Sequence, residues 1–332
     1  MGFWQRLLWL EDKTEPVRVA LVGEKSQERK LLEQAYQQNP HIQVIYTSQE
    51  INPEKISREV ELVEIFAPPK ETSELAEEFL KKRFNISVGM PPALSLEEIN
   101  FLQELSQKHQ NWVRVRNPCF YYQPFQKACE IIKKEKLGYP LMLRLIVKRS
   151  PKPEDGLDWG KWILEKESDF LALAEELYGP IEKVFAMSNS ENSKEIGSII
   201  IGFKFQAQHR MGYLLLDFAS QLHIRTFTFP VFRQLWATGT AGVLMINRGE
   251  GQLWRVPPLL LRAKNYSHTY ENLKDSWQDA YSEMVKEVAV SLRKNLHPGF
   301  GLSRAKRGLI IALSVQASLE QKREIPLSQP LS

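Results

Sequence analysis

The fold is decided by the segment Val17-Arg-Val-Ala-Leu-Val-Gly-Glu-Lys-Ser-Gln-Glu28. Its opening run, 17–22, is apolar and rich in β-branched residues, as a buried strand is, and a polar helix over 28–38 follows directly. A strand that ends in a glycine and passes into a helix is the frame of the G-x-G-x-x-G turn, which holds a dinucleotide pyrophosphate. The segment therefore predicts the first βαβ unit of a parallel sheet.

Two glycines of that turn are missing. The second glycine lets the backbone approach the pyrophosphate, and the third lets the helix pack closely on the strand. Those positions hold Lys25 and Glu28. A lysine could meet a phosphate through its side chain, but a glutamate at the helix N-terminus puts negative charge where the anion would bind. The sequence predicts a dinucleotide-binding turn whose affinity for the cofactor is weakened or lost. The remaining candidate contacts are Gly23, Lys25 and Ser26.

Composition is that of an ordinary globular protein. The 332 residues exceed the length at which one core usually stops growing, so two domains are expected. The net charge of +4 gives no reason to expect a nucleic-acid partner, which would need clustered basic residues. The two cysteines, Cys119 and Cys129, argue against a disulfide scaffold and predict a reducing, cytoplasmic setting.

The first ten residues are apolar and then break into Glu11-Asp-Lys13. This run is too short for a secretory leader or a membrane span, so no transmembrane segment is expected. Its large apolar residues form one stripe of a helix: Phe3, Trp4, Leu7, Leu8 and Leu10. We expect a helical extension over 1–16 that clamps on its own protein or on a protein partner. Contact with a membrane surface is the less favoured alternative.

The pattern of elements changes near residue 137. Before it, strands alternate with helices, which predicts a parallel sheet with helices on both faces. The strands are expected at 17–22, 42–46, 62–66, 86–88 and 113–115, and the helices at 28–38, 53–58, 72–83, 95–109 and 125–136. The helix at 95–109 opens with Ser95 and Glu98 in the spacing of a capping box. We expect a Rossmann-like domain over 17–137.

Beyond residue 137, successive strands joined by short polar turns predict a large, open and mostly antiparallel sheet. The strands are expected at 141–147, 181–187, 198–205, 211–218, 223–229, 234–238, 243–246 and 252–256. A loop is expected at 148–159, and helices at 166–177, 275–296 and 303–321. The fold class is thus α/β, with a second α/β domain over 138–332 whose last helix can pack back on the first domain.

Five short motifs follow one another along the chain. They are Phe66-Ala-Pro-Pro-Lys70, Ile86-Ser-Val-Gly-Met-Pro-Pro-Ala-Leu-Ser-Leu-Glu-Glu98, Leu137-Gly-Tyr-Pro140, Ala237-Thr-Gly-Thr-Ala-Gly-Val-Leu244 and Trp277-Gln-Asp-Ala280. In this order they resemble the A-T-P turn, the V-x-x-E-K-P-x-x-x-S-x-E-E signature, the I-G-x-P turn, the G-T-x-G-x-L turn and the late helix of the Gfo/Idh/MocA family of NAD(P)-dependent oxidoreductases. The resemblance covers about 17–327. It implies a Rossmann domain joined to an open-sheet α/β domain, and an NAD(P) site that includes Pro68 and Pro91.

The residues that carry this family's chemistry are replaced. Met90 stands where the family has the lysine of E-K-P, which polarises the reacting hydroxyl. Counting back from Tyr178-Gly179 puts Asp169 at the family's acid/base histidine and Glu165 at its aspartate. Ser48 follows the second strand, where an acidic residue would hold a ribose. Four residues apart on a helix, Asp169 and Glu165 could form a catalytic carboxylate pair, although a charged first turn is the simpler interpretation.

The resemblance places a substrate cleft beside the aromatic run Phe120, Tyr121 and Tyr122. These rings could stack on a planar ligand, but core packing explains two of the three equally well. Lys161, ahead of the helix at 166–177, could line the same cleft. The histidines show no metal-ligand spacing, so no metal site is predicted.

Two functions stay open. The leading hypothesis is a divergent member of this fold, degenerate in its cofactor loop and catalytic residues, that acts as a ligand-binding or partner-regulating subunit. The alternative is an active NAD(P)H-dependent reductase with non-standard acid/base chemistry, in which Lys25 and Ser48 hold a phosphate. Biliverdin reductases resemble the family and also lack the E-K-P lysine. A homo-oligomer is expected through the second sheet, whose alternate apolar residues need cover on both sides: Ile199, Ile201, Phe203, Leu214, Leu216 and Phe218.

Overall fold

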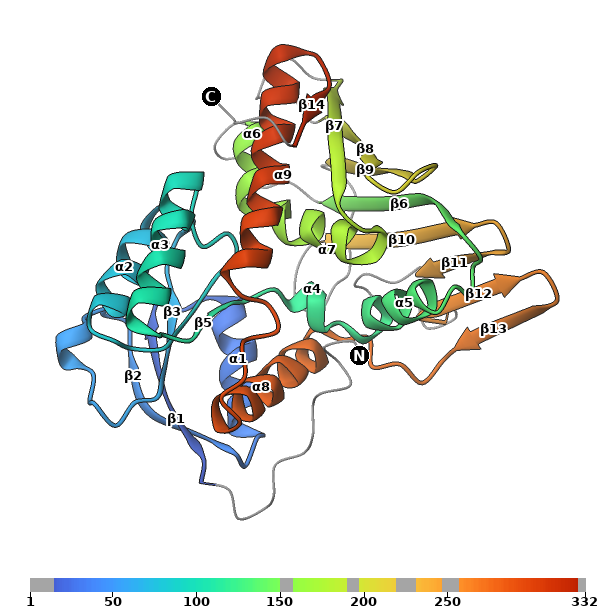
Figure 1. Ribbon diagram of the computed structural model, residues 1–332. Helices are drawn as coiled ribbons and strands as arrows, with labels where there is room; N and C mark the ends of the chain where they lie inside the picture. The colour runs from blue at the N-terminus through green and yellow to red at the C-terminus, as the bar shows by residue number, and fades with distance from the viewer. Residues whose placement is uncertain (1–14, 150–157, 190–196, 219–230, 247–256, 328–332) are drawn as a thin grey trace. The chain divides into compact units, whose positions relative to one another are not determined.

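The computed structural model describes residues 15–149, 158–189, 197–218, 231–246 and 257–327 (Figure 1). The expected N-terminal helix, the expected strands at 223–229 and 252–256, and most of the expected loop at 148–159 lie outside these residues. The chain forms two compact units. The first unit comprises Met1–Tyr121 and Trp277–Leu309, and the second comprises Tyr122–Ser276 and Ile310–Ser332.

A parallel sheet forms the core of the first unit, with the strand order β2-β1-β3-β4-β5. Its strands are β1 (Val17–Gly23), β2 (Ile42–Ser48), β3 (Leu62–Phe66), β4 (Ile86–Val88) and β5 (Val113–Val115). All of β3 and nearly all of β1 are buried, as expected for strands covered on both faces. Because β2 and β3 lie on opposite sides of β1, the strand order reverses between β1 and β3. Open α/β sheets bind ligands at the carboxyl ends of such strands.

Helices cover this sheet: α1 (Gln27–Gln37), the 3-10 turn η2 (Pro53–Lys55), α2 (Pro69–Lys81), α3 (Leu96–His109), α4 (Pro118–Tyr121), α8 (Trp277–Arg293) and the start of α9 (Leu302–Gln321). The capping box predicted at α3 is present, since Ser95 accepts from the Glu98 amide and the Glu98 carboxylate accepts from the Ser95 amide. Helix α8 packs on α1, where Gln278 Nε2 donates to the Leu31 carbonyl at 3.3 Å.

A mixed sheet organises the second unit, in the order β13-β12-β11-β10-β6-β9-β8-β7-β14. Its strands are β6 (Pro140–Arg149), β7 (Ile181–Ser188), β8 (Ser198–Phe205), β9 (Met211–Phe218), β10 (Val231–Gly239), β11 (Gly242–Ile246), β12 (Leu259–Ala263), β13 (Tyr266–Tyr270) and β14 (Ile325–Pro326). In the described part of the sheet, β6 and β9 pair in parallel and the other neighbouring strands pair antiparallel. The predicted fold class, a Rossmann-type parallel sheet followed by a large, mostly antiparallel sheet, is confirmed.

The helices of the second unit lie on one face of its sheet: α5 (Gln123–Lys133), α6 (Trp159–Trp162), a π-helical turn η3 (Ile163–Glu167), α7 (Ser168–Tyr178) and the end of α9. The six apolar residues expected at a subunit interface belong to this covered face and are at most 4% exposed: Ile199, Ile201, Phe203, Leu214, Leu216 and Phe218. The choice of those residues was therefore wrong, because the alternation was assigned to the wrong face of the sheet. The other face, called the uncovered face because no helix of the described residues lies on it, carries the intervening residues, among them Met187 and Ile200.

Candidate functional site

The turn between β1 and α1 is held by groups of the chain itself. Gly23 adopts φ +108°, and a Cβ there would lie 2.0 Å from the Phe66 carbonyl oxygen, so only glycine fits. The Glu24 amide donates to that same oxygen at 2.9 Å. At the start of α1, Ser26 Oγ accepts from the Arg29 amide at 3.1 Å. The first free amides of the helix are thus partly satisfied before any ligand arrives.

Glu28, in the first turn of α1, forms an ion pair with Arg116. The Arg116 Nε donates to Glu28 Oε1 at 3.0 Å. Arg116 follows β5 and is buried, and its Nη1 donates to the Glu64 carboxylate at 2.8 Å and to the Ser87 carbonyl at 2.9 Å. Its Nη2 donates to the Ile65 carbonyl at 2.8 Å. One guanidinium therefore ties α1 to the carboxyl ends of β3 and β4.

Glu64, fully buried on β3, forms ion pairs with both Arg114 and Arg116. It accepts from Arg114 Nη2 at 2.5 Å and from the Tyr36 hydroxyl as well as from Arg116. Burial raises the pKa of Glu64, but the two guanidinium groups outweigh burial and hold the pKa below its usual range. Burial also raises the pKa of Tyr36 well above normal, so the phenol stays a hydrogen-bond donor. Each polar group in this buried cluster has a partner, as a buried charge requires.

A second guanidinium lies between the carboxyl ends of β1 and β2. Arg29 is 3% exposed, and its Nη1 donates to the Gly23 carbonyl at 2.5 Å and to the Ser48 carbonyl at 3.0 Å. Its Nε donates to Glu33 at 2.8 Å. The Ser48 hydroxyl accepts from the Glu50 amide at 2.9 Å. At the end of β2, where the family has a carboxylate that binds a ribose, this chain therefore has Ser48, whose backbone carbonyl accepts from Arg29.

The predicted cofactor residues of the first unit meet at one edge of the sheet. Gly23 ends β1, Ser48 ends β2, Pro68 follows β3 and Pro91 follows β4, so parallel pairing brings them to neighbouring positions. Lys25 and Ser26 are exposed at the turn, and Pro91 is buried next to the half-buried Met90. A Cβ on Gly89 would lie 3.6 Å from Arg116 Nη2, so the turn that carries Met90 borders the buried guanidinium.

The candidate catalytic carboxylates belong to the second unit. Asp169, in the first turn of α7, accepts from the Phe170 amide at 2.7 Å and lies 3.5 Å from Arg233 Nη1. Glu165 is half-buried in the π-helical turn. Sequence reasoning missed Glu167, which is fully buried and pairs with Arg149 at 2.6 Å and Arg233 at 3.5 Å. Glu165 and Glu167 lie in a π-helical turn, where the spacing of an α-helix does not predict which of the two side chains is buried.

Phe120, Tyr121 and Tyr122, the aromatic candidates for the cleft, are buried. In the first unit, the rings of Phe120 and Phe300 lie 5.5 Å apart, and the Tyr121 hydroxyl donates to Glu287 at 3.1 Å. In the second unit, the Tyr122 hydroxyl donates to the Asp275 carbonyl at 3.1 Å. Lys161, in contrast, is exposed, and its amide donates to Asp158 Oδ1 at 3.1 Å.

Two surveys of the described ranges bear on function. No group of three or more His, Cys, Asp or Glu side chains there is arranged to hold a metal ion. No helix within the same ranges combines the length and apolar character that crossing a membrane requires.

No protein-family model and no curated protein matches the sequence. Solved structures do resemble the fold. An oxidoreductase from Agrobacterium radiobacter in complex with NAD+, L-tartaric acid and magnesium has a TM-score of 0.79 at 12% identity, over 94% of this chain and 98% of that chain. An NAD-binding oxidoreductase from Klebsiella pneumoniae has a TM-score of 0.76 at 13% identity, over 95% and 99% of the two chains.

An oxidoreductase from Pseudomonas syringae has a TM-score of 0.77 at 13% identity, over 95% of this chain and 99% of that chain. At such low identity the likeness shows the fold alone. At that level the resemblance to the Gfo/Idh/MocA oxidoreductases is confirmed. The chain has the fold of NAD-dependent oxidoreductases.

Proposed function

We propose that the chain is a divergent member of this oxidoreductase fold that no longer holds a dinucleotide in the usual way and acts as a ligand-binding or partner-regulating subunit. The observation that carries the proposal is the ion pair between Glu28 and Arg116 at the carboxyl ends of the central strands. It lies where open α/β sheets of this kind bind their ligands.

The residues at the β1–α1 turn do not fit a pyrophosphate. A helix N-terminus attracts an anion through its unpaired amides and its positive partial charge. Here Ser26 already accepts from one of those amides, and the Glu28 carboxylate supplies negative charge in the same turn. A pyrophosphate would have to overcome repulsion from Glu28 or break its 3.0 Å contact with Arg116. Both routes lower affinity for a dinucleotide.

The ribose position and the acid/base positions support the same proposal. Ser48 ends β2, where the family has an acidic residue for a ribose hydroxyl, and the Ser48 carbonyl accepts from Arg29. Met90 cannot supply the positive charge of the family's lysine. In the second unit, Asp169 stands where the family has its acid/base histidine, and its carboxylate lies 3.5 Å from Arg233 Nη1.

An active NAD(P)H-dependent reductase with non-standard acid/base chemistry is the second candidate. It is favoured by the exposed Lys25 and Ser26 at the turn, which can approach a phosphate from the solvent side. The neighbour from Agrobacterium radiobacter, solved with NAD+, also shows that this fold accommodates the cofactor in a related chain. Under this candidate Glu28 must leave Arg116 when the cofactor binds.

We also propose that two copies pair through the uncovered face of the second sheet. Met187, Ile200, Leu215 and Ile146 are register partners on four adjacent strands and form one apolar row across that face. Met187 is 54% exposed and Ile200 is 45% exposed. A two-fold pairing buries the same row on both copies. The N-terminal Trp/Leu segment is proposed as a second surface for a protein partner, in a cytoplasmic setting.

The proposal is tested by restoring the turn. In Lys25→Gly/Glu28→Gly, the backbone can approach a phosphate, and the freed Arg116 Nε becomes a donor to it. We expect NADH or NADPH to bind at least about tenfold more tightly than to the natural protein, a gain of about 1.4 kcal/mol, as measured by nicotinamide fluorescence. Glycine at position 28 costs up to about 1 kcal/mol of helix stability, so thermal unfolding is followed in parallel.

The matched control is Glu24→Gly/Gln27→Gly, which adds two glycines and removes one negative charge beside the same turn without a contact to Arg116. It should leave binding unchanged. Met90→Lys/Asp169→His, with the turn untouched, should not create cofactor binding either. Tight binding by the natural protein, or equal gains in the two glycine variants, would favour the reductase candidate.

A further inference from the structure

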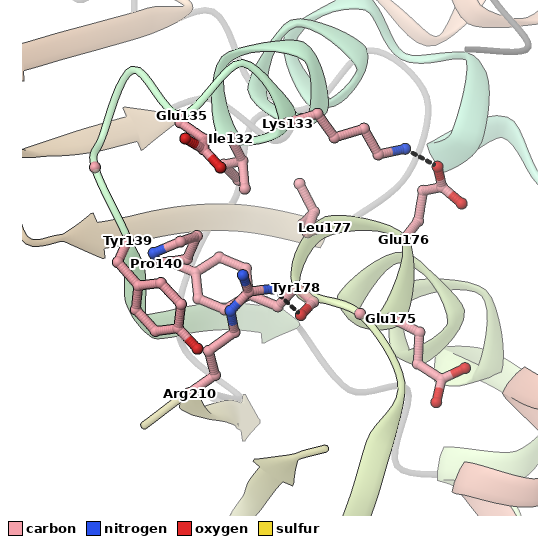
Figure 2. Close-up of a pocket in the computed structure, with 12 residues that line it drawn as sticks. Ile132, Lys133, Glu135, Tyr139, Pro140, Glu175, Glu176, Leu177, Tyr178 and Arg210 are labelled. Atoms are coloured by element: carbon pink, nitrogen blue, oxygen red, sulfur yellow. Dashed lines mark hydrogen bonds and ion pairs between the residues drawn. The ribbon is translucent and has the colours of Figure 1, made fainter. Parts of the chain in front are cut away.

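A cavity of about 610 Å³ opens within the second unit (Figure 2). It lies between the end of α5, the turn 138–140, the end of α7 and Arg210, which precedes β9. Cavities of 300–1,000 Å³ are the usual size of small-molecule sites. No residue of the β1–α1 turn or of the Asp169 region lines it, so it is independent of the function proposed above.

Arg210 is the distinctive group of this cavity. Its guanidinium lies 5.0 Å from the centre of the Tyr139 ring, and Nη1 donates to the Tyr178 carbonyl at the end of α7, at 2.9 Å. The Tyr139 hydroxyl is itself anchored to the Gln208 carbonyl at 2.5 Å. The guanidinium is thus held by its contact with the Tyr139 ring and by one hydrogen bond to the end of α7. Among the described residues, no carboxylate pairs with Arg210.

Most of the other charged groups that line the cavity form ion pairs or hydrogen bonds within the protein. Lys133 Nζ lies 2.6 Å from Glu176, as the dashed line in Figure 2 shows. Glu175 accepts from the Ile181 amide at 2.8 Å. Glu135 is exposed and lies on the side of the cavity away from Arg210 (Figure 2). Ile132, Leu177 and Pro140 contribute apolar groups to the rest of the lining.

We propose that this cavity binds a small organic monocarboxylate with an apolar body, held through Arg210. A planar guanidinium offers a fork of donors that matches a carboxylate, and stacking on an aromatic ring fixes that fork in place. The apolar lining contacts the body of the ligand. Glu135, on the side of the cavity away from Arg210, repels a second negative charge, so a dicarboxylate or a phosphate ester binds less well than a monocarboxylate.

The test compares three probes of similar shape on the full-length protein: phenylacetate, phenylmalonate and phenethylammonium. We expect phenylacetate to bind with a Kd of about a millimolar or below by titration calorimetry, and the other two to bind at least about tenfold more weakly. Arg210→Gln should weaken phenylacetate at least about tenfold, since it removes the fork and the positive charge. Arg262→Gln, which removes an exposed arginine of β12 outside the cavity, should leave the affinity unchanged.

Glu135→Gln provides a second, independent test. It removes the negative charge on the opposite side of the cavity and leaves Arg210 in place. The affinity for phenylacetate should rise about two- to fivefold, and the gain should shrink at high salt. The proposal fails if phenylacetate does not bind at about 10 mM, where a Kd near 1 mM gives about 90% saturation. It also fails if phenethylammonium binds best of the three probes. It fails as well if both Arg210→Gln and Glu135→Gln leave the affinity for phenylacetate unchanged. The dinucleotide titrations are unaffected by any of these results.

Discussion

Glu64 is the carboxylate that pairs with two buried arginines of the first unit, Arg114 and Arg116. It is fully buried on β3, and it compensates both Arg114 and Arg116, the latter of which also holds Glu28. The sequence shows that Glu28 replaces a glycine, but it does not show the partner of Glu28, because Arg116 is 88 residues away. A close contact of this kind depends on the strand order, which brings the ends of β3, β4 and β5 together. Local patterns carry no signal for it.

Replacing Glu64 tests this arrangement. The pKa of Glu64 is lower in the folded protein than in the unfolded chain, so ionised Glu64 stabilises the fold above about pH 4.3, and this contribution is lost as the pH falls through the folded-state pKa. Glu64→Gln leaves two buried guanidinium groups undercompensated and should cost about 3–5 kcal/mol at pH 7. Urea unfolding at pH 7 and pH 3 should show a smaller cost at the lower pH.

Glu97→Gln is the control for that experiment, since Glu97 is exposed on the first turn of α3. Its stability should differ from that of the natural protein by less than about 0.5 kcal/mol at both values of pH. An equal loss for Glu64→Gln at pH 7 and pH 3 would mean that its ionised form does not hold the cluster together.

At the scale of elements, the sequence is most informative where periodicity is strong. The buried strands β1 and β3 and the capped helix α3 were predicted close to their observed bounds. Three strands were missed, β12, β13 and β14. Strand β13 is exposed at nearly every position, so it shows no alternation, and β14 has only two residues. For β8 and β9 the alternation was correct, but it does not say which face is covered by helices.

The uncovered face of the second sheet leads to a prediction about assembly. Ile200→Lys puts a charge in the centre of the row formed by Met187, Ile200, Leu215 and Ile146. We expect the natural protein to sediment as a dimer at roughly tens of micromolar, and the variant as a monomer, because burying an unpaired charge at an interface is costly. Phe101→Lys, at an apolar residue of α3 that is 44% exposed, should leave the assembly unchanged. A monomeric natural protein would contradict the proposed pairing.

At the scale of the molecule, the order of the motifs predicted more than any single motif did. Each match to the Gfo/Idh/MocA pattern is loose, yet their order agrees with the two sheets that the strand and helix pattern predicted. Solved structures with TM-scores of 0.76–0.79 share the fold at 12–13% identity. The candidate site was less predictable. Arg29 and Arg116 look like ordinary charged residues in the sequence, and only the fold places them at the carboxyl ends of the parallel strands. The cavity beside Arg210 likewise depends on segments far apart in the chain.

The Glu28–Arg116 ion pair lies at the turn where a dinucleotide would bind. The most direct test is a calorimetric titration of the natural protein with NAD+, NADH, NADP+ and NADPH at pH 7.5. We expect a Kd of about a millimolar or weaker for each of them, a binding free energy of no more than about 4 kcal/mol in magnitude. A micromolar Kd for any of the four would show that the altered turn still holds a dinucleotide, and it would contradict the proposed loss of cofactor binding.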